Sequence, residues 1–151
     1  MNAPLTGPTA VVCIATFSFF SCGDSPADNP QNQQQVTETS ILTLDSLKAA
    51  HPDAILLDVR SDEEWAAGHL LGASYVSFDW DHRKDSLSEI PWDGPVLVYC
   101  EAGGRSGVVT EELRIIGHPH IIDLIGGMER WLENKKPLDF DVPVPVMPEV
   151  D

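Results

Sequence analysis

The sequence predicts a single α/β domain with three layers, in which a parallel β-sheet carries helices on both faces. Two observations support this prediction. Short aliphatic runs bounded by turn-forming residues alternate along the chain with segments of helical spacing, a pattern typical of strands joined by crossover helices. The chain has 151 residues, of which 42% are hydrophobic, and this is enough for one compact core. We therefore expect one domain.

The predicted elements follow one another without repeats. The helix over 43–50 has Thr43 as its expected N-cap, and the helix after Ser61 begins with a cap and an acidic first turn and ends at Gly68. Residues 79–88 are polar and are expected to form an irregular helix or a loop. In chain order, the elements are a helix at 43–50, a strand at 54–59, a helix at 61–67, a strand at 74–78, a strand at 95–99, a helix at 105–116, a strand at about 121–122 and a helix from 128 onward.

The N-terminal part of the chain differs from the domain. Residues 8–21 form an uncharged apolar stretch that is short for a membrane span and that ends directly before Cys22. The stretch resembles a bacterial lipoprotein signal, in which such a cysteine is lipidated and becomes the mature N-terminus. A disordered start or a buried strand is the alternative.

Four segments follow from this interpretation of the chain. We expect a cleaved signal at 1–21, a disordered polar tether at 22–38, the domain at 39–136 and an irregular, proline-rich tail at 137–151. The protein would then be held in the bacterial cell envelope by lipid on Cys22, whereas the alternative start implies a cytoplasmic protein.

The charge balance and the cysteines exclude several classes of protein. The chain has 24 acidic and 9 basic residues and a net charge of −15, which disfavours binding of nucleic acid or of an anionic membrane surface through a basic patch. Three cysteines cannot all pair, and no Cys-x-x-Cys is present, so neither a disulfide scaffold nor a thiolate metal site is expected. We expect a monomer.

Cys100 is the residue that the sequence sets apart. It follows the apolar run 95–99 and precedes a helical segment that begins at Arg105, so it lies where a strand ends and a helix begins. Gly103 and Gly104 allow positive φ angles that direct backbone N–H groups to one point. The helix N-terminus and the arginine cation both favour a thiolate there. The alternative is a small buried side chain without chemistry.

The segment from Cys100 to Ser106 resembles the catalytic loop of the rhodanese family of sulfurtransferases, in which a cysteine opens a short loop that an arginine and a hydroxyl residue close. Three further segments resemble the family in the expected order, and together the resemblance covers about residues 41–136. These segments are Leu56-Leu-Asp-Val-Arg60, Gly68-His-Leu-Leu-Gly-Ala73 and Asp123-Leu-Ile-Gly-Gly-Met-Glu-Arg-Trp131.

The resemblance implies a role for each residue of the loop. Cys100 is the nucleophile, Arg105 steers an anionic donor and helps to close the loop, and Ser106 supports the loop or donates to the sulfur. The backbone that surrounds the transferred sulfur belongs to Glu101, Ala102, Gly103 and Gly104. Glu101 departs from the family, where many relatives have a basic or polar residue, and its carboxylate should oppose a small anionic donor such as thiosulfate.

The length of the loop distinguishes two reactions. Cysteine phosphatases place one more residue between cysteine and arginine than the four found here, and the smaller ring should exclude phosphate. It can instead surround the outer sulfur of a Cys100 persulfide. We expect transfer of sulfane sulfur from a donor such as thiosulfate to a thiol or cyanide, with no metal or organic cofactor, since the covalent sulfur is the carrier. A non-catalytic interaction module is the alternative.

Other polar and aromatic residues have plainer explanations. Asp58 and Arg60 follow the strand at 54–59 and could orient the loop, although a salt bridge or cap is favoured. His69 is expected to be a hydrogen-bonded core residue. Trp80 could line a substrate entrance, but Trp80 and Trp92 are more simply anchors for surface loops. His118 and His120 are attributed to a turn before a strand, since two histidines alone make a weak metal site.

Overall fold

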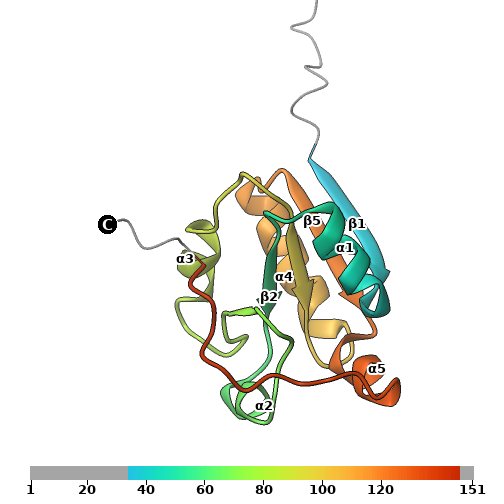
Figure 1. Ribbon diagram of the computed structural model, residues 1–151. Helices are drawn as coiled ribbons and strands as arrows, with labels where there is room; N and C mark the ends of the chain where they lie inside the picture. Colours follow the sequence, from blue (N-terminus) through green and yellow to red (C-terminus); the bar gives the residue numbers. More distant parts are fainter. Residues whose placement is uncertain (1–33, 147–151) are drawn as a thin grey trace, which may run out of the picture.

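The computed structural model describes residues 34–146 and contains one five-stranded, fully parallel sheet (Figure 1). The strands lie in the order β1-β5-β4-β2-β3. The strands are β1 (Gln35–Ser40), β2 (Ile55–Asp58), β3 (Ser74–Tyr75), β4 (Val96–Tyr99) and β5 (His120–Ile125), and the helices are the 3-10 turn η1 (Ile41–Thr43), α1 (Leu44–Ala50), α2 (Asp62–Ala66), α3 (Arg83–Ser88), α4 (Gly104–Ile116) and α5 (Gly127–Glu133).

Helices cover both faces of the sheet, as predicted for a three-layer α/β domain. Alternate residues of each strand point to opposite faces, so the core is divided into two clusters. On the α1 and α5 face, Leu97 and Tyr99 of β4 pack with Leu44 and Trp131. On the other face, Val98 and Cys100 pack with side chains of α3 and α4, among them Leu87, Val109 and Leu113. The predicted fold class is confirmed, and Cys100 points to the α4 side.

Three local predictions need correction. Residues 35–38, predicted to be part of the tether, belong to β1, whose partner is β5. Thr43 does not cap α1 with its side chain: its hydroxyl donates to the Ser40 carbonyl at 2.7 Å, and Ser40 itself caps the preceding 3-10 turn. The third strand is only two residues long because Val76 to Phe78 leave the ladder, although the amides of Val76 and Phe78 still bond to carbonyls of Asp58 and Arg60.

The tail after α5 returns along the domain, as Figure 1 shows, and has little regular structure up to residue 146. Its path is fixed by backbone hydrogen bonds, with a two-way exchange between His69 and Asp139 and a bond from the Val144 amide to the Ala73 carbonyl. Gly68, with φ of +122°, gives the tail room, because a Cβ there would lie 2.8 Å from Leu138 Cδ1. The tail therefore covers the segment that links α2 to β3.

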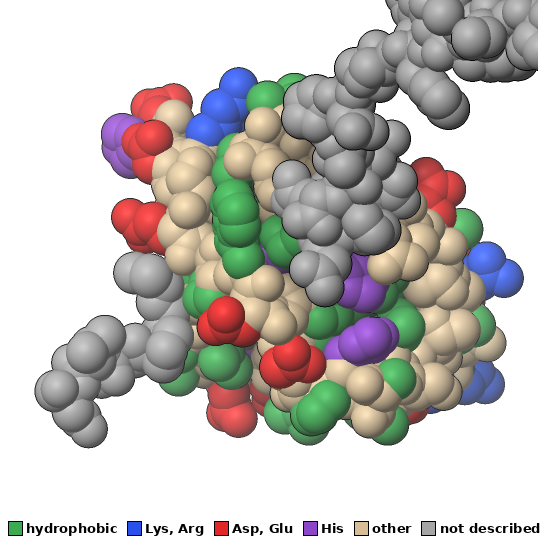
Figure 2. All heavy atoms as spheres, turned by 90° about the horizontal axis from the view of Figure 1, so that it is seen from above, with side chains coloured by type: hydrophobic (Ala, Val, Ile, Leu, Met, Phe, Trp, Pro, Cys, Tyr) green, Lys and Arg blue, Asp and Glu red, His purple; other side chains and the backbone are tan. Residues whose placement is uncertain are grey.

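The far end of the sheet, at the amino ends of the strands, carries histidines. The rings of His51 and His120 meet edge to face at 5.6 Å, and Figure 2, which looks down on this end, shows histidine side chains close together, with hydrophobic and acidic side chains nearby. His118 is buried with Nε2 3.0 Å from the Pro91 carbonyl, so it fixes the turn before β5 as expected. Within residues 34–146, no group of three or more possible ligands has the arrangement of a metal site.

The predicted signal at 1–21, the predicted lipidation site Cys22 and the predicted tether up to residue 33 lie outside the described residues, as do residues 147–151. In the part of the chain from 34 to 146, no helix is both long enough and apolar enough to cross a membrane.

Candidate active site

Cys100 forms the floor of a short loop at the carboxyl end of β4. The strand ends at Tyr99, and α4 begins at Gly104, so the loop runs from one to the other in four residues. The amide of Gly103 donates to Cys100 Sγ at 3.1 Å, and the cysteine is only 1% exposed. The amides of the first turn of α4 follow directly, and by helix geometry they have no acceptor within the helix. The sulfur thus lies where backbone N–H groups favour negative charge.

Gly103 gives the loop its shape. Its φ of +116° is left-handed, which costs other residues free energy and glycine very little. The carbonyl of Gly103 then accepts from the Ser106 hydroxyl at 3.1 Å and from the Gly107 amide at 3.1 Å, which ties the loop to α4. A Cβ built on Gly103 or Gly104 would have no neighbouring element within 4 Å, so neither glycine is required by close packing.

Helix α5 supports the loop from behind, and the sequence pattern does not indicate this role. The amides of Met128 and Glu129 donate to the carbonyls of Cys100 and Glu101 at 3.0 and 2.9 Å. The sequence predicts a flexible turn at Gly127, but a Cβ at this position would lie 2.3 Å from the Cys100 carbonyl oxygen. Position 127 therefore requires glycine, because the backbone of α5 approaches the backbone of the loop too closely for a side chain. Because the carbonyls turn toward α5, the loop is held with its amide side toward the sulfur.

Arg105 is bound to a residue that the sequence pattern does not single out. Its guanidinium forms a bidentate pair with Glu64, with Nη1 to Oε2 at 2.5 Å and Nη2 to Oε1 at 2.6 Å. Glu64 also accepts from the Ser61 amide at 2.8 Å, in a capping box at the start of α2. Hydrogen bonding to Arg105 lowers the pKa of Glu64 to about 2, and the same bond raises the pKa of Arg105.

Asp58 and Arg60 form a buried ion pair beside the loop, which confirms the predicted salt bridge. Asp58 is fully buried and accepts from the Arg60 guanidinium at 2.8 to 3.1 Å. Arg60 also donates to the Gly68 carbonyl at 2.7 Å and, more loosely, to Glu101 Oε2 at 3.4 Å. The pair therefore links the segment after β2 to Glu101 in the Cys100 loop.

Asp123 lies on β5 behind the Cys100 loop, next to α4. Its side chain is almost fully buried, and among the described residues its Oδ1 atom has no hydrogen-bond partner. Burial raises the pKa of Asp123, while the nearby Ser106 hydroxyl opposes the shift and the Glu38 carboxylate adds to it. Thr110, one helical turn beyond Ser106, also has a buried oxygen without a partner within residues 34–146.

Aromatic residues form a row next to α2. His69 is buried, stacks on Trp65 at 3.5 Å and places Nδ1 3.3 Å from the Trp65 carbonyl, which confirms it as a core residue. Tyr75 stacks on Trp65 at 4.7 Å and meets Trp80 edge to face at 5.4 Å. Trp80 and Trp92 are 40% and 56% exposed. Trp80 is thus anchored on Tyr75 with one side left open.

The structure brings the predicted residues of the loop together and adds two partners to them. The loop residues Glu101 to Ser106, Cys100 and the Asp58–Arg60 pair all meet at the carboxyl end of the sheet. Glu64 and Gly127 are the additions. The Ser-x-x-Glu pattern at Ser61 signals a cap, although nothing in it indicates Arg105 as a partner. The double glycine is visible in the sequence, but the backbone that it approaches lies far away along the chain.

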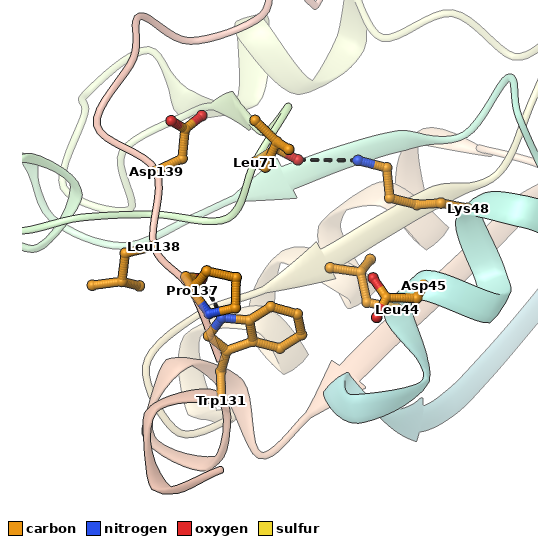
Figure 3. A pocket seen from close by; sticks show the side chains of 8 residues that line it. All are labelled: Leu44, Asp45, Lys48, Leu71, Trp131, Pro137, Leu138 and Asp139. Atoms are coloured by element: carbon orange, nitrogen blue, oxygen red, sulfur yellow. Dashed lines mark hydrogen bonds between the residues drawn. The ribbon is translucent and has the colours of Figure 1, made fainter. Parts of the chain in front are cut away.

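A separate hollow lies on the α1 and α5 face. It has a volume of about 370 Å³ and is lined by Leu44, Asp45, Lys48, Leu71, Trp131, Pro137, Leu138 and Asp139. Figure 3 shows the Trp131 ring at one side and Lys48 reaching across to the Leu71 carbonyl, at 3.0 Å. None of these residues belongs to the Cys100 loop, so the hollow is not part of the candidate active site.

The arrangement can stabilise a sulfur anion held on Cys100. A sulfur bonded to Sγ would lie about 2 Å from it, next to the loop whose Gly103 amide already donates to Sγ. Within the described residues, Cys100 is the one cysteine, so no thiol of this part of the chain can resolve an adduct. With respect to residues 34–146, sulfur bound to Cys100 could leave only to an acceptor outside this part of the chain.

Comparison with known proteins agrees with this geometry. Residues 43–134 match the family described as Rhodanese-like domain. The chain is 36% identical over 99 residues to the protein YqhL of Bacillus subtilis, an alignment that covers 66% of this chain and 75% of YqhL. It is 30% identical over 117 residues to the thiosulfate sulfurtransferase of Pseudomonas aeruginosa and covers 42% of that protein. It is 29% identical over 103 residues to a sulfurtransferase of Allochromatium vinosum and covers 94% of it.

Solved structures show the same fold. The crystal structure of a rhodanese-like domain protein from Staphylococcus aureus aligns with a TM-score of 0.60 at 24% identity and covers 70% of this chain and 99% of that one. The structure of a rhodanese-related protein from Thermoplasma volcanium aligns with a TM-score of 0.57 at 22% identity, over 72% and 99% of the two chains. At these identities the likeness concerns the fold alone.

Proposed function

The chain belongs to the rhodanese-like domain family, and from this premise we propose that it is a sulfurtransferase that carries sulfane sulfur as a Cys100 persulfide. One observation supports the proposal most strongly. Cys100 Sγ accepts from the Gly103 amide at the floor of a four-residue loop that leads into the N-terminus of α4. This is a preorganised site for negative charge on sulfur.

The reaction has two displacement steps. The Cys100 thiolate attacks the outer sulfur of a donor; a new S–S bond forms, and the old one breaks with its electron pair leaving on sulfite or on a thiolate. A thiolate or cyanide then attacks the outer sulfur of the persulfide and takes it, which restores the Cys100 thiolate. No oxidant is needed, because the transferred sulfur keeps its oxidation state in both steps. In both steps, the loop amides stabilise charge on the transferred sulfur.

Supporting residues hold the loop in shape. Ser106 and the Gly107 amide bind the Gly103 carbonyl, and α5 binds the carbonyls of Cys100 and Glu101. These bonds keep the loop carbonyls away from the sulfur, where their partial negative charge would oppose the persulfide. The Asp58–Arg60 pair holds the adjoining segment.

Two other functions are the alternatives. Phosphate chemistry is disfavoured by the length of the loop, which has one residue fewer than in cysteine phosphatases. An interaction module in which Cys100 is incidental is disfavoured by the bonds that five backbone and side-chain groups devote to the shape of the loop.

The test is sulfur transfer to cyanide or to a small thiol, measured with several donors for the full chain and for Cys100→Ala. We expect the native chain to produce thiocyanate or a low-mass persulfide with at least one donor and Cys100→Ala to lose this activity, with unchanged folding. Hydrolysis of aryl phosphates through Cys100 without any sulfur transfer would replace the proposal with a phosphatase function.

A further inference from the structure

The charges around the loop decide which donors can approach Cys100. Arg105 is expected to attract an anionic donor, but both of its terminal nitrogens are bound to Glu64 at 2.5 and 2.6 Å. Glu64 is itself fixed by the Ser61 amide at 2.8 Å, and its side chain is only 30% exposed. The carboxylate is positioned before any donor arrives, so the positive charge of Arg105 is neutralised at the site.

The second cation near the loop is also neutralised. Arg60 is buried, and its guanidinium is bound to Asp58 and to the Gly68 carbonyl. Its remaining terminal nitrogen points to Glu101, whose carboxylate is 3.4 Å away and 40% exposed. Two guanidinium groups thus face three carboxylates. These five side chains together have a net negative charge.

The elements next to the loop do not make the charge around it positive. Asp62 and Glu63 add negative charge in the first turn of α2, next to Glu64. On α5, which packs behind the loop, Glu129 and Arg130 contribute one charge of each sign. The whole chain has a net charge of −15, so the long-range field is also negative. A doubly charged anion such as thiosulfate is therefore repelled both by the charges beside the loop and by the net charge of the whole chain.

We propose that the loop of this protein selects organic persulfides without net negative charge, amine-bearing ones above all, and that Glu64 and Glu101 are the residues that set this preference. The inference rests on the proposed sulfurtransferase function. In the loading step, the Cys100 thiolate attacks the outer sulfur of R–S–SH; the new S–S bond forms, and the R–S bond to that sulfur breaks with its electron pair leaving on RS⁻, which takes up a proton. The charge of R decides the rate of encounter, and the chemistry is unchanged.

The experiment compares two donors, thiosulfate and the persulfide of cysteamine, by the rate at which each loads sulfur onto Cys100. Intact mass sampled over time gives the rate constants. Each is measured at about 0.02 M and about 0.2 M NaCl, because salt screens charge and its effect does not depend on how reactive each donor is. The variants are Glu64→Gln, Glu101→Gln and the double variant. Gln at position 64 keeps an oxygen for the Ser61 amide, so the cap of α2 is retained.

Glu111→Gln is the matched control. It makes the same change of charge on α4, where Glu111 pairs with Arg114 at 2.6 Å on the exposed surface, away from the loop. It therefore separates the local field at the loop from the net charge of the chain.

We expect salt to speed loading from thiosulfate and to slow loading from the cationic persulfide in the native protein. Each variant at Glu64 or Glu101 should raise the thiosulfate rate by about threefold to tenfold at low salt, as expected when one negative charge is removed beside the loop, and should leave the persulfide rate equal or lower. Glu111→Gln should change neither rate. If Glu64→Gln does not fold, Glu101→Gln decides alone.

Two results would overturn the inference while leaving the function intact: thiosulfate loading that slows with salt in the native protein, or variants that change both donor rates by the same factor. The absence of any sulfur adduct with either donor is a different outcome, since it contradicts the sulfurtransferase function itself.

Discussion

Asp123 is a buried acid that the reaction does not use, and its surroundings oppose its charge. It lies behind the loop on β5, one of its oxygens has no partner among residues 34–146, and burial raises the pKa of its carboxyl group. In the unfolded chain, the same carboxyl group is ionised at neutral pH. An acid whose pKa is higher in the folded state destabilises the fold above that pKa, and this effect disappears below the pKa of the unfolded chain.

Asp123→Asn should therefore raise the free energy of unfolding at pH 7, by about 1 kcal/mol, because the amide has the same shape and no charge to bury. The difference in stability between the variant and the native protein should shrink as the pH falls toward about 4, because Asp123 then becomes neutral in the unfolded chain as well as in the folded protein. Urea unfolding of both proteins at several pH values measures it. The control is Asp81→Asn, at an exposed position. A variant that is less stable than the native protein at pH 7 would mean that the carboxylate makes a favourable interaction.

At the scale of the elements, the sequence pattern correctly predicts a strand whose side chains are buried on both faces of the sheet. All residues of β4 are buried, so its aliphatic run is continuous, and the helical spacing of α4 follows directly. The prediction misses β1 because Gln35-Val-Thr-Glu-Thr-Ser40 contains one aliphatic residue and lies at the edge of the sheet with most side chains exposed. Its strand form depends on pairing with β5, which no local pattern contains.

The contact between α5 and the loop gives a prediction for Gly127. Replacement by Ala places a Cβ within 2.4 Å of the carbonyl oxygens of Cys100 and Glu101, at a φ of +51°, so α5 must move away from the loop. We expect a loss of about 2–4 kcal/mol in stability and a loss of more than about tenfold in sulfur loading even where the protein remains folded.

Gly107→Ala is the control for this prediction. The glycine lies inside α4, where a Cβ would have an ordinary contact of 3.8 Å with Asp123 Oδ2, so Ala should be tolerated and should favour the helix slightly. Thermal unfolding and loading rates measure both variants. Equal behaviour of the two alanine variants would show that α5 does not shape the loop.

At the scale of the whole molecule, the site is assembled from three loops that follow β2, β4 and β5. The residues of the loop after β4 are adjacent in sequence, so the amino-acid sequence alone is enough to select Cys100, the glycines, Arg105 and Ser106. Glu64 and Arg105 are 41 residues apart, and Gly127 reaches the backbone of Cys100 from another element. Only the register of the sheet brings these groups together, and local spacing does not contain that register.

The N-terminal segment gives a prediction about the whole chain. If Cys22 is lipidated after removal of residues 1–21, the protein should fractionate with membranes in its native host, and Cys22→Ser should release it. Sulfur transfer to a soluble acceptor should be equal in both forms, because the site lies entirely within residues 34–146. Fractionation of the host cells followed by intact mass measures this. Recovery of the unlipidated, full-length native chain from the cytoplasm would contradict export and leave the chemistry at Cys100 unaffected.

The central claim is that Cys100 carries sulfur, and intact mass of the native protein after incubation with a persulfide donor tests it most directly. We predict a gain of one sulfur atom, mapped by peptide mass to the segment containing Cys100, reversed by cyanide and absent in Cys100→Ala. The same protein incubated with a donor should show no gain at any other residue of the domain. A folded native protein that gains no sulfur from either thiosulfate or the persulfide of cysteamine, or that gains it equally in Cys100→Ala, would contradict the account.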